Sequence, residues 1–217
     1  MFRIISGVVL ATALALPGAV LSAPALAAAP SAFKAKGHVH SITDGEPQDM
    51  NVAVSYKSGK VRVETMSKDI GKSIMVAHRG KDSVAMLDPD QKMIVRMKPS
   101  AMRGAAQDDV PQFDVLLDPG GFKKMVEKEG KRVGPGDAIL GHKTTIWERT
   151  QKSGKMRVWL ADDVDLPLRM EGKSNRGDSF KLAISALDLK PTFGKDDFND
   201  APSGYQEISA EETGGKN

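Results

Sequence analysis

Apolar and polar residues alternate with a period of two along much of the chain, most clearly in residues 138–172. Two alternating segments there are centred on Trp147 and Trp159, a third follows Leu166, and short turns separate them. Successive side chains of a β-strand point to opposite faces of its sheet, so this period is typical of half-buried strands. The pattern predicts three antiparallel strands in this stretch, with both tryptophans packed against the sheet.

The same alternation occurs in six short segments between Phe33 and Met97, separated by turn residues at nearly regular spacing. In the turn at 88–91, Pro89 presets the backbone and the neighbouring aspartates can accept bonds from backbone N–H groups. Residues 178–189 alternate again, and we predict that they form the longest strand. A meander of this kind is typical of an antiparallel sheet, sandwich or barrel.

The pattern changes at Pro99. Residues 99–112 have no clean period, and apolar residues then recur at helical spacing from Phe113 to Glu129, where Gly130 is a plausible helix stop. We therefore expect a loop and one or two short helices, which can lie across the concave face of a curved sheet. Residues 195–200 suggest one further helical turn.

The N-terminus has the pattern of a secretory signal peptide: Arg3, an apolar run, and Ala25-Leu26-Ala27 as the cleavage site. Residues 1–27 are therefore expected to be removed. Residues 28–206 are expected to form one domain and residues 207–217 a disordered tail. No later segment approaches the roughly 20 apolar residues of a membrane span, so the sequence predicts a periplasmic protein with no span after cleavage.

Composition narrows the possible functions. The formal net charge is only +3, with 31 basic and 28 acidic residues, which argues against nucleic acid as a partner. The chain has no cysteine, which excludes disulfides, a thiol nucleophile, a thiolate metal site and a lipidated cysteine.

No catalytic set is recognisable in the sequence. His38 and His40 share one strand face and have a spacing that can chelate a metal, but lysines accompany them, which favours a solvated surface. Acidic clusters at 162–165 and 196–200 lack the ligand spacing of a calcium loop and are interpreted as turn carboxylates. We therefore predict no enzyme activity, no catalytic residue, no metal and no cofactor.

Methionine is frequent, with 11 residues, whereas aromatic residues make up 5% of the chain. Flexible thioether side chains either fill irregular cores or line surfaces that accept varied apolar ligands. Strand parity selects candidate lining residues of a cavity, although parity alone does not tell which face is concave. The candidates are Met75, Met86, Met93, Val95, Met97, Val158, Leu168 and Met170 from strands, with Phe122 and Met125 from the helical segment.

Four motifs in order resemble the periplasmic lipoprotein carrier (LolA-like) superfamily, in particular its uncharacterised members similar to outer-membrane lipoprotein-sorting proteins. They are the Asp-Pro turn and strand at 88–95, the segment 139–147, the pair 158–162 and 166–171, and the closing motif 198–205. The resemblance implies a mainly β fold with a few helices (α+β). It also implies a strongly curved antiparallel sheet of about eleven strands, an open half-barrel with helices or loops over its concave face.

In the carriers of that superfamily the cavity accepts the acyl chains of a lipoprotein. The leading hypothesis is therefore a non-enzymatic periplasmic protein that binds an apolar ligand, a lipid or an acylated polypeptide, in the half-barrel. The alternative is a protein-interaction or envelope-stress-sensing module without lipid cargo, whose partner is an envelope protein.

Overall fold

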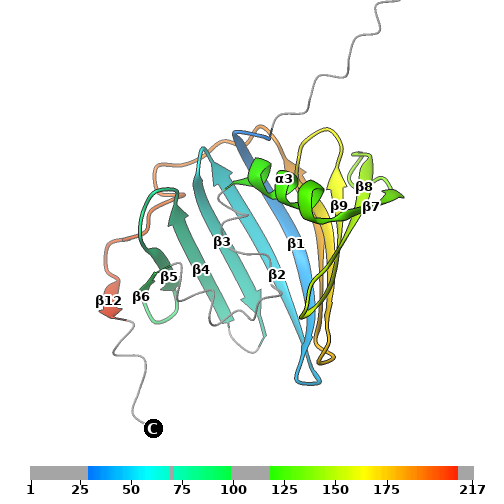
Figure 1. Ribbon diagram of the computed structural model, residues 1–217. Helices are drawn as coiled ribbons and strands as arrows, with labels where there is room; N and C mark the ends of the chain where they lie inside the picture. Colours follow the sequence, from blue (N-terminus) through cyan, green and yellow to red (C-terminus); the bar gives the residue numbers. More distant parts are fainter. Residues whose placement is uncertain (1–28, 69–70, 99–117, 210–217) are drawn as a thin grey trace, which may run out of the picture.

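Twelve strands form one open sheet in the computed structural model, which describes residues 29–68, 71–98 and 118–209 (Figure 1). The order across the sheet is β12-β6-β5-β4-β3-β2-β1-β11-β10-β9-β8-β7, so β12 and β7 are its two edges. Every neighbouring pair is antiparallel except β12 and β6, which are parallel. The strands are β1 Ala32–Thr43, β2 Glu46–Lys57, β3 Lys60–Ser67, β4 Gly71–His78, β5 Val84–Asp88, β6 Met93–Met97, β7 Lys131–Pro135, β8 Thr144–Thr150, β9 Gly154–Ala161, β10 Pro167–Ser174, β11 Ser179–Asp188 and β12 Gln206–Ser209.

Two tight turns fix the register at the centre of the sheet. Asp44-Gly45 joins β1 to β2, Ser58-Gly59 joins β2 to β3, and all four residues have φ between 47° and 83°. A two-residue turn with both φ values positive matches the right-handed twist of the strands that it joins. The predicted hairpins are therefore confirmed, and they place β1, β2 and β3 side by side.

Helix α3, Pro119–Glu129, is the only helix in the described ranges, and it covers one face of the sheet (Figure 1). Asp118 caps it by accepting a hydrogen bond from the Gly121 N–H, and Pro119 occupies the first turn, where a missing N–H costs little. Its buried residues Phe122 and Val126 pack against the sheet. We call the face that α3 covers the concave face, and the opposite face the convex face.

The strands beneath α3 separate apolar from charged residues by face. Directly paired residues of these strands form an apolar row on the concave face. Their chain neighbours form a second row on the convex face, and that row is charged. The concave row comprises Met50, Val39, Leu182, Met170, Val158 and Trp147. The convex row comprises Asp49, His40, Lys181, Glu171, Arg157, Glu148 and Lys131.

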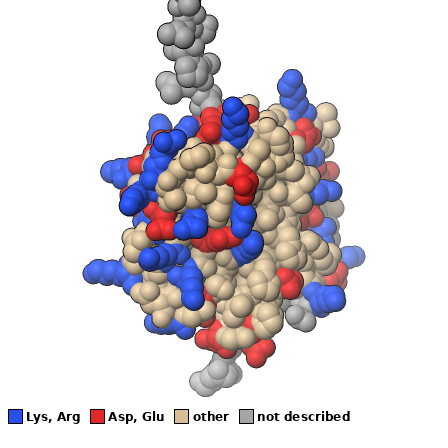
Figure 2. All heavy atoms as spheres, turned by 90° about the vertical axis from the view of Figure 1, so that its right-hand side faces the viewer, with Lys and Arg blue, Asp and Glu red and all other residues tan. Residues whose placement is uncertain are grey.

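Charges in the convex row pair across strands. Lys181 lies 3.4 Å from Glu171, and Arg157 lies 3.0 Å from Glu148. Basic and acidic side chains are interspersed on this side of the molecule (Figure 2). Each exposed pair contributes about 0–1 kcal/mol to stability. The row therefore stabilises the fold little, and its main effect is to keep this face in contact with solvent.

At the other half of the sheet the convex face is buried. Ile74, Val76, Ala85, Leu87 and Ile94 form a core cluster on the convex side of β4, β5 and β6. Tyr205 packs against this cluster at the end of the segment 189–205, which follows β11 and crosses the convex face. At β8–β11 the sheet therefore buries its concave face. At β4–β6 it buries its convex face, together with the concave residues Ala77 and Val84.

Most of the predicted architecture is confirmed. The six strands predicted between residues 33 and 97 are β1–β6, and the three predicted in residues 138–172 are β8, β9 and β10. The first of those three begins later than expected, because residues 139–142 form a bridged turn in which Ile139 and His142 exchange two backbone hydrogen bonds. The helical turn suggested at 195–200 is not a helix: residues 195–198 form a non-helical turn, in which the Gly194 N–H donates to Asp197 Oδ2.

Three expectations need correction. The sheet has twelve strands, whereas the resemblance implied about eleven and the sequence pattern predicted ten, because the pattern missed β7 and β12. Each of these edge strands is short and has few apolar residues, so it shows little alternation. β12 also extends into the segment expected to be a disordered tail. The longest strands are β1 and β2, with 12 residues each, and not β11, with 10.

Several expectations fall on residues outside the described ranges. They are the signal peptide at 1–27, the loop at 99–112 and the first part of the helical segment, from Phe113 to residue 117. No helix within 29–68, 71–98 or 118–209 has the length and apolar character needed to cross a membrane.

Candidate binding face

An apolar row on the concave face crosses eight strands at the half of the sheet that α3 leaves uncovered. Its members are direct cross-strand partners, so their side chains lie next to one another on one face. We call this set the open row. Its members are Leu187, Ala35, Val54, Val63, Met75, Met86, Val95 and Ile208.

The open row is neither a closed core nor a solvated surface. Ala35 is buried, and the other seven members are half-buried. The next concave row towards the β2–β3 turn is more enclosed: Val61, Ala77 and Val84 are at most 1% exposed. On the other side, Thr65 and Ser73 are cross-strand partners and bring two half-buried hydroxyl groups to the same face.

The five sequence candidates from β4, β5 and β6 lie at this uncovered half. Met75, Met86 and Val95 belong to the open row, while Met93 and Met97 flank Val95 on the same face of β6. All five are half-buried. The structure therefore brings these five candidates together on one accessible apolar surface.

The other five candidates lie in closed packing. Phe122, Val158 and Met170 form a buried cluster under α3, and Met125 packs against it. Leu168 belongs to a separate buried cluster with Phe33, Tyr56 and Leu166, and the open-row members Val54 and Leu187 pack against that cluster. Leu168 is therefore a core residue at the border of the open row, and the other four belong to the packing between helix and sheet.

Val54 and Val63 are members of the open row that the sequence candidates omitted. Both follow the same period-two alternation as their neighbours, but the register that places Val63 opposite Met75 depends on the pairing of β3 with β4. The alternation therefore marked both residues as apolar strand positions, but it did not show which residues lie opposite them.

Three ion pairs hold α3 in place over the packed half. Asp118 at its start contacts Arg79 of the β4–β5 turn at 3.3 Å, and Glu129 at its end pairs with Arg149 of β8. Between them, Lys123 Nζ donates to Asp165 Oδ1 at 2.5 Å in the β9–β10 turn. Asp165 is only 7% exposed, so loss of this partner would leave a nearly buried carboxylate without an ion pair.

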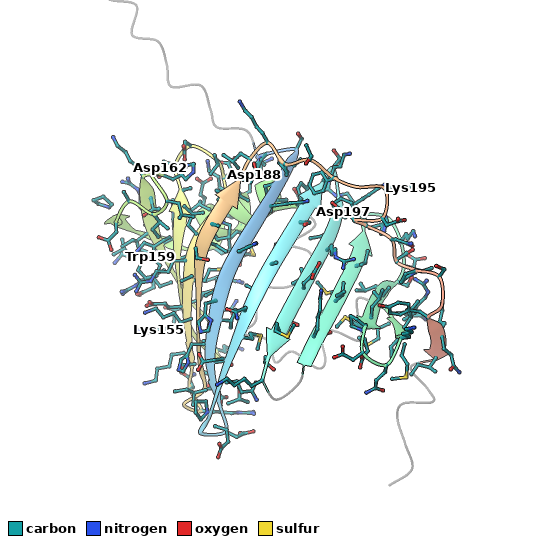
Figure 3. All side chains as sticks on the ribbon, turned by 180° about the vertical axis from the view of Figure 1, so that it is seen from behind. Lys155, Trp159, Asp162, Asp188, Lys195 and Asp197 are labelled. Carbon is teal, nitrogen blue, oxygen red and sulfur yellow. The ribbon has the colours of Figure 1, made fainter. Side chains whose placement is uncertain are left out.

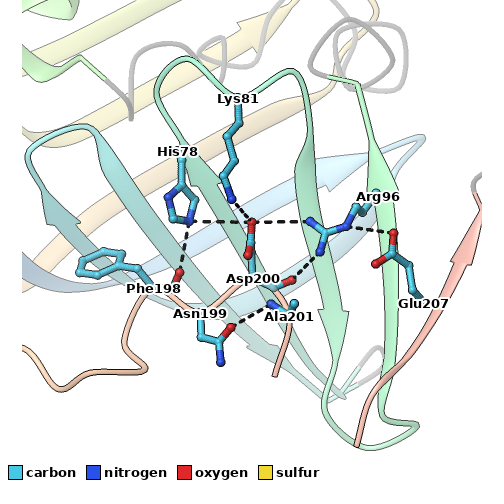
Figure 4. A network of polar contacts seen from close by, with 8 residues as sticks. All are labelled: His78, Lys81, Arg96, Phe198, Asn199, Asp200, Ala201 and Glu207. Atoms are coloured by element: carbon cyan, nitrogen blue, oxygen red, sulfur yellow. Dashed lines mark hydrogen bonds and ion pairs between the residues drawn. The ribbon is translucent and has the colours of Figure 1, made fainter. Parts of the chain in front are cut away.

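A polar network fastens the segment 189–205 to the convex face (Figure 4). Asp200 accepts a hydrogen bond from Lys81 Nζ at 2.7 Å and lies 3.6 Å from Arg96. Burial raises the pKa of the Asp200 carboxyl, but the Lys81 hydrogen bond and the nearby charges outweigh burial and hold that pKa below its usual value.

His78 belongs to the same network. Its Nε2 donates to the Phe198 carbonyl at 3.2 Å and lies 4.0 Å from Asp200. Burial, and then the positive charge of Lys81, lower the pKa of His78 below its usual value. The neutral imidazole is therefore the form that fits this position.

His38 and His40 share one acceptor on the convex face. His38 Nε2 and His40 Nδ1 lie 3.0 and 2.9 Å from the same Asp49 oxygen. The hydrogen bond to Asp49, and then that to Asn51, raise the pKa of His38. Both rings are substantially exposed, as expected for surface histidines. Within the described ranges no group of three or more His, Cys, Asp or Glu residues has the geometry to hold a metal ion.

No family model matches the sequence, and no curated protein matches it. Among solved structures, the fold is similar to that of an uncharacterised conserved protein from Thermus thermophilus. The TM-score is 0.54 at 12% identity, over 83% of this chain and 91% of that chain.

Two further structures carry the family name that the sequence motifs suggested. A LolA superfamily protein from Nitrosomonas europaea gives a TM-score of 0.46 at 10% identity, over 80% of this chain and 92% of that chain. A putative outer membrane lipoprotein-sorting protein domain from Vibrio parahaemolyticus gives 0.41 at 15% identity, over 78% and 89%. The open, mainly antiparallel sheet that the resemblance implied is confirmed by the strand order of this chain.

Proposed function

We propose that this protein is a non-enzymatic periplasmic binding protein that holds an apolar ligand, a lipid or an acylated polypeptide, against the open row. The supporting observation is that seven apolar side chains of this row are half-buried and adjacent. A contiguous apolar surface that keeps part of its area in contact with solvent is typical of a binding site.

Burial of apolar area can supply the affinity. A ligand that removes about 400 Å² of apolar surface from water gains about 10 kcal/mol at 25 cal/mol per Å², before the cost of ordering the complex. Methionine side chains from β4, β5 and β6 adapt to ligands of varied shape. Thr65 and Ser73 offer hydroxyl groups to a polar part of the ligand at the border of the row.

The expected compartment agrees with this role. The signal peptide inferred from residues 1–27 would direct the chain to the periplasm, where proteins that cover acyl chains have a use. The concave side chains of β3, β4 and β5 are mainly apolar, which suits binding better than acid–base chemistry.

The test uses native mass spectrometry and organic extraction of the protein purified from the periplasm of the organism that produces it. Met86→Glu places a carboxylate in the open row, while Met66→Glu makes the same change on the convex face of β3, where Met66 is 48% exposed. Because a carboxylate against an apolar ligand is costly, we expect Met86→Glu to retain less than about a tenth of the lipid that wild type carries. Met66→Glu should retain all of it.

Wild-type protein that carries no lipid would contradict the proposal. If a stoichiometric envelope protein is recovered in its place, the alternative of a protein-interaction or envelope-stress-sensing module is favoured. Equal lipid loss in both variants would show that the open row is not the binding surface.

A further inference from the structure

A cavity lies away from the open row. It has a volume of about 750 Å³ and is formed where residues 193–200 pass the β2–β3 turn. Lys195 and Asp197 mark this segment at one end of the sheet (Figure 3). We call it the rim pocket. Its lining residues are Lys57, Ser58, Lys60, Phe193, Gly194, Lys195, Asp196, Phe198, Asn199 and Asp200. Its volume falls within the roughly 300–1,000 Å³ of small-molecule sites.

Three lysines of the rim pocket have no carboxylate partner within the described ranges. Lys57, Lys60 and Lys195 make no ion pair there, whereas nearby Lys34 and Lys81 are engaged by Asp197 and Asp200. Their three ammonium groups, which make no ion pair within the described ranges, belong to side chains that line the same pocket.

The lining carboxylates do not cancel this charge. Asp200 is already neutralised by Lys81 and Arg96 from outside the pocket, which leaves Asp196 as the single opposing carboxylate among the lining residues. Three lysines thus outnumber one free carboxylate. The lowered pKa of His78 agrees with an excess of positive charge here. Burial and the charge of Lys81 lower it most, and the charge of Lys60 lowers it further.

Aromatic rings form one wall of the rim pocket. The Phe193 and Phe198 centroids are 5.1 Å apart. The Lys57 ammonium lies 5.6 Å from the centroid of Phe193, a cation–π distance that favours one position of this flexible side chain. The pocket therefore offers positive charge beside an apolar surface.

We propose that the rim pocket binds a phosphate group, either of a soluble phosphate compound or of a phospholipid headgroup. A phosphate monoester carries a charge of about −1.5 to −2 near neutral pH, which matches the excess of positive charge better than the single charge of a carboxylate does. Lysines hold phosphate as point charges from several directions. The phenylalanine wall accommodates the carbon atoms next to the phosphate. This site is independent of any ligand on the open row.

Isothermal titration calorimetry at constant ionic strength tests the proposal, with inorganic phosphate and with dihexanoyl phosphatidic acid below its micelle concentration. The variant is Lys57→Gln with Lys60→Gln. The matched control is Lys155→Gln with Lys173→Gln, a pair of exposed cross-strand lysines whose removal changes the net charge equally. Lys155 lies far from Lys195 (Figure 3).

We expect saturable binding to wild type, about tenfold weaker for each pocket lysine removed, and unchanged within about twofold in the control. Equal affinity for both probes assigns the site to soluble phosphate compounds, and tighter binding of the lipid assigns it to a headgroup. No saturable binding of either probe would overturn the proposal, as would equal weakening in the two double variants. If the pocket variant does not fold, Lys195→Gln takes its place, because it alters an exposed side chain that makes no ion pair within the described ranges.

Discussion

The two halves of the sheet differ in how their two faces are covered. At β8–β11 the concave face is closed by α3, and charged side chains cover the convex face. At β4–β6 the convex face is closed by the segment that ends at Tyr205, and the concave open row stays half-buried. A sheet needs only one covered face for a core, so the second apolar face at β4–β6 exceeds what the core requires. We propose that this second apolar face is the surface that binds the ligand.

The largest expected difference between the halves is in stability. Phe122 is 2% exposed under α3, so Phe122→Ala should lower the free energy of unfolding by about 3–4 kcal/mol. Met86 is half-buried, and Met86→Ala should cost only about 1 kcal/mol because its site is already partly open. Urea unfolding of both variants measures the contrast. Equal losses would mean that the open row is as closed as the packing under α3.

A second contrast concerns the attachment of α3. Lys123→Ala leaves Asp165 nearly buried without its partner and should cost about 2–4 kcal/mol. Lys124→Ala, at an exposed position of the same helix, should change stability by less than about 0.5 kcal/mol. Hydrogen exchange of α3 amides should accelerate in the first variant alone. Unchanged exchange there would show that apolar packing holds the helix without the ion pair.

The smallest expected effects are on pH dependence, and they have opposite signs at His78 of β4 and His38 of β1. The folded pKa of His78 lies below its usual 6.5, so its unfavourable protonation removes stability as the pH falls through 6.5. The folded pKa of His38 lies above 6.5, so its contribution is complete below 6.5 and is lost as the pH rises through the raised value.

Thermal unfolding between pH 5 and pH 8 measures both histidine effects. His78→Gln should reduce the gain in stability with rising pH, and His38→Gln should reduce the loss. The same sign of change in both variants would contradict the assigned environments. Asp200 affects stability at lower pH. The pKa of its carboxyl is depressed in the folded state, so the stability that it contributes is lost as the pH falls from 3.8 through the folded pKa.

The sequence predicted the strands well because alternation is a local property. It also indicated that both faces are apolar at β4. Ile74-Met75-Val76-Ala77 is a continuous apolar run, which is typical of a strand with two apolar faces. Parity placed the candidates on one face correctly, but only the contact of Phe122 with Val158 and Met170 tells which face α3 covers.

The rim pocket had no comparable local signal. It joins the β2–β3 turn to residues 193–200, more than 130 positions away in the sequence, so its lysines and phenylalanines meet only through the tertiary fold. The acidic cluster at 196–200 was interpreted as turn carboxylates, and Asp200 in addition holds this segment to Lys81 and Arg96. Long-range pairing of this kind does not appear in the period of a single segment.

The most direct measurement of the central claim is NMR of protein labelled with ¹³C at the methionine methyl groups, titrated with lauric acid and assigned by single Met→Leu substitutions. The account predicts saturable shifts at Met75, Met86 and Met97 around the open row, with Met66 on the convex face and buried Met170 unchanged. Shifts at Met66 alone, or no saturable shift at any methionine, would contradict it.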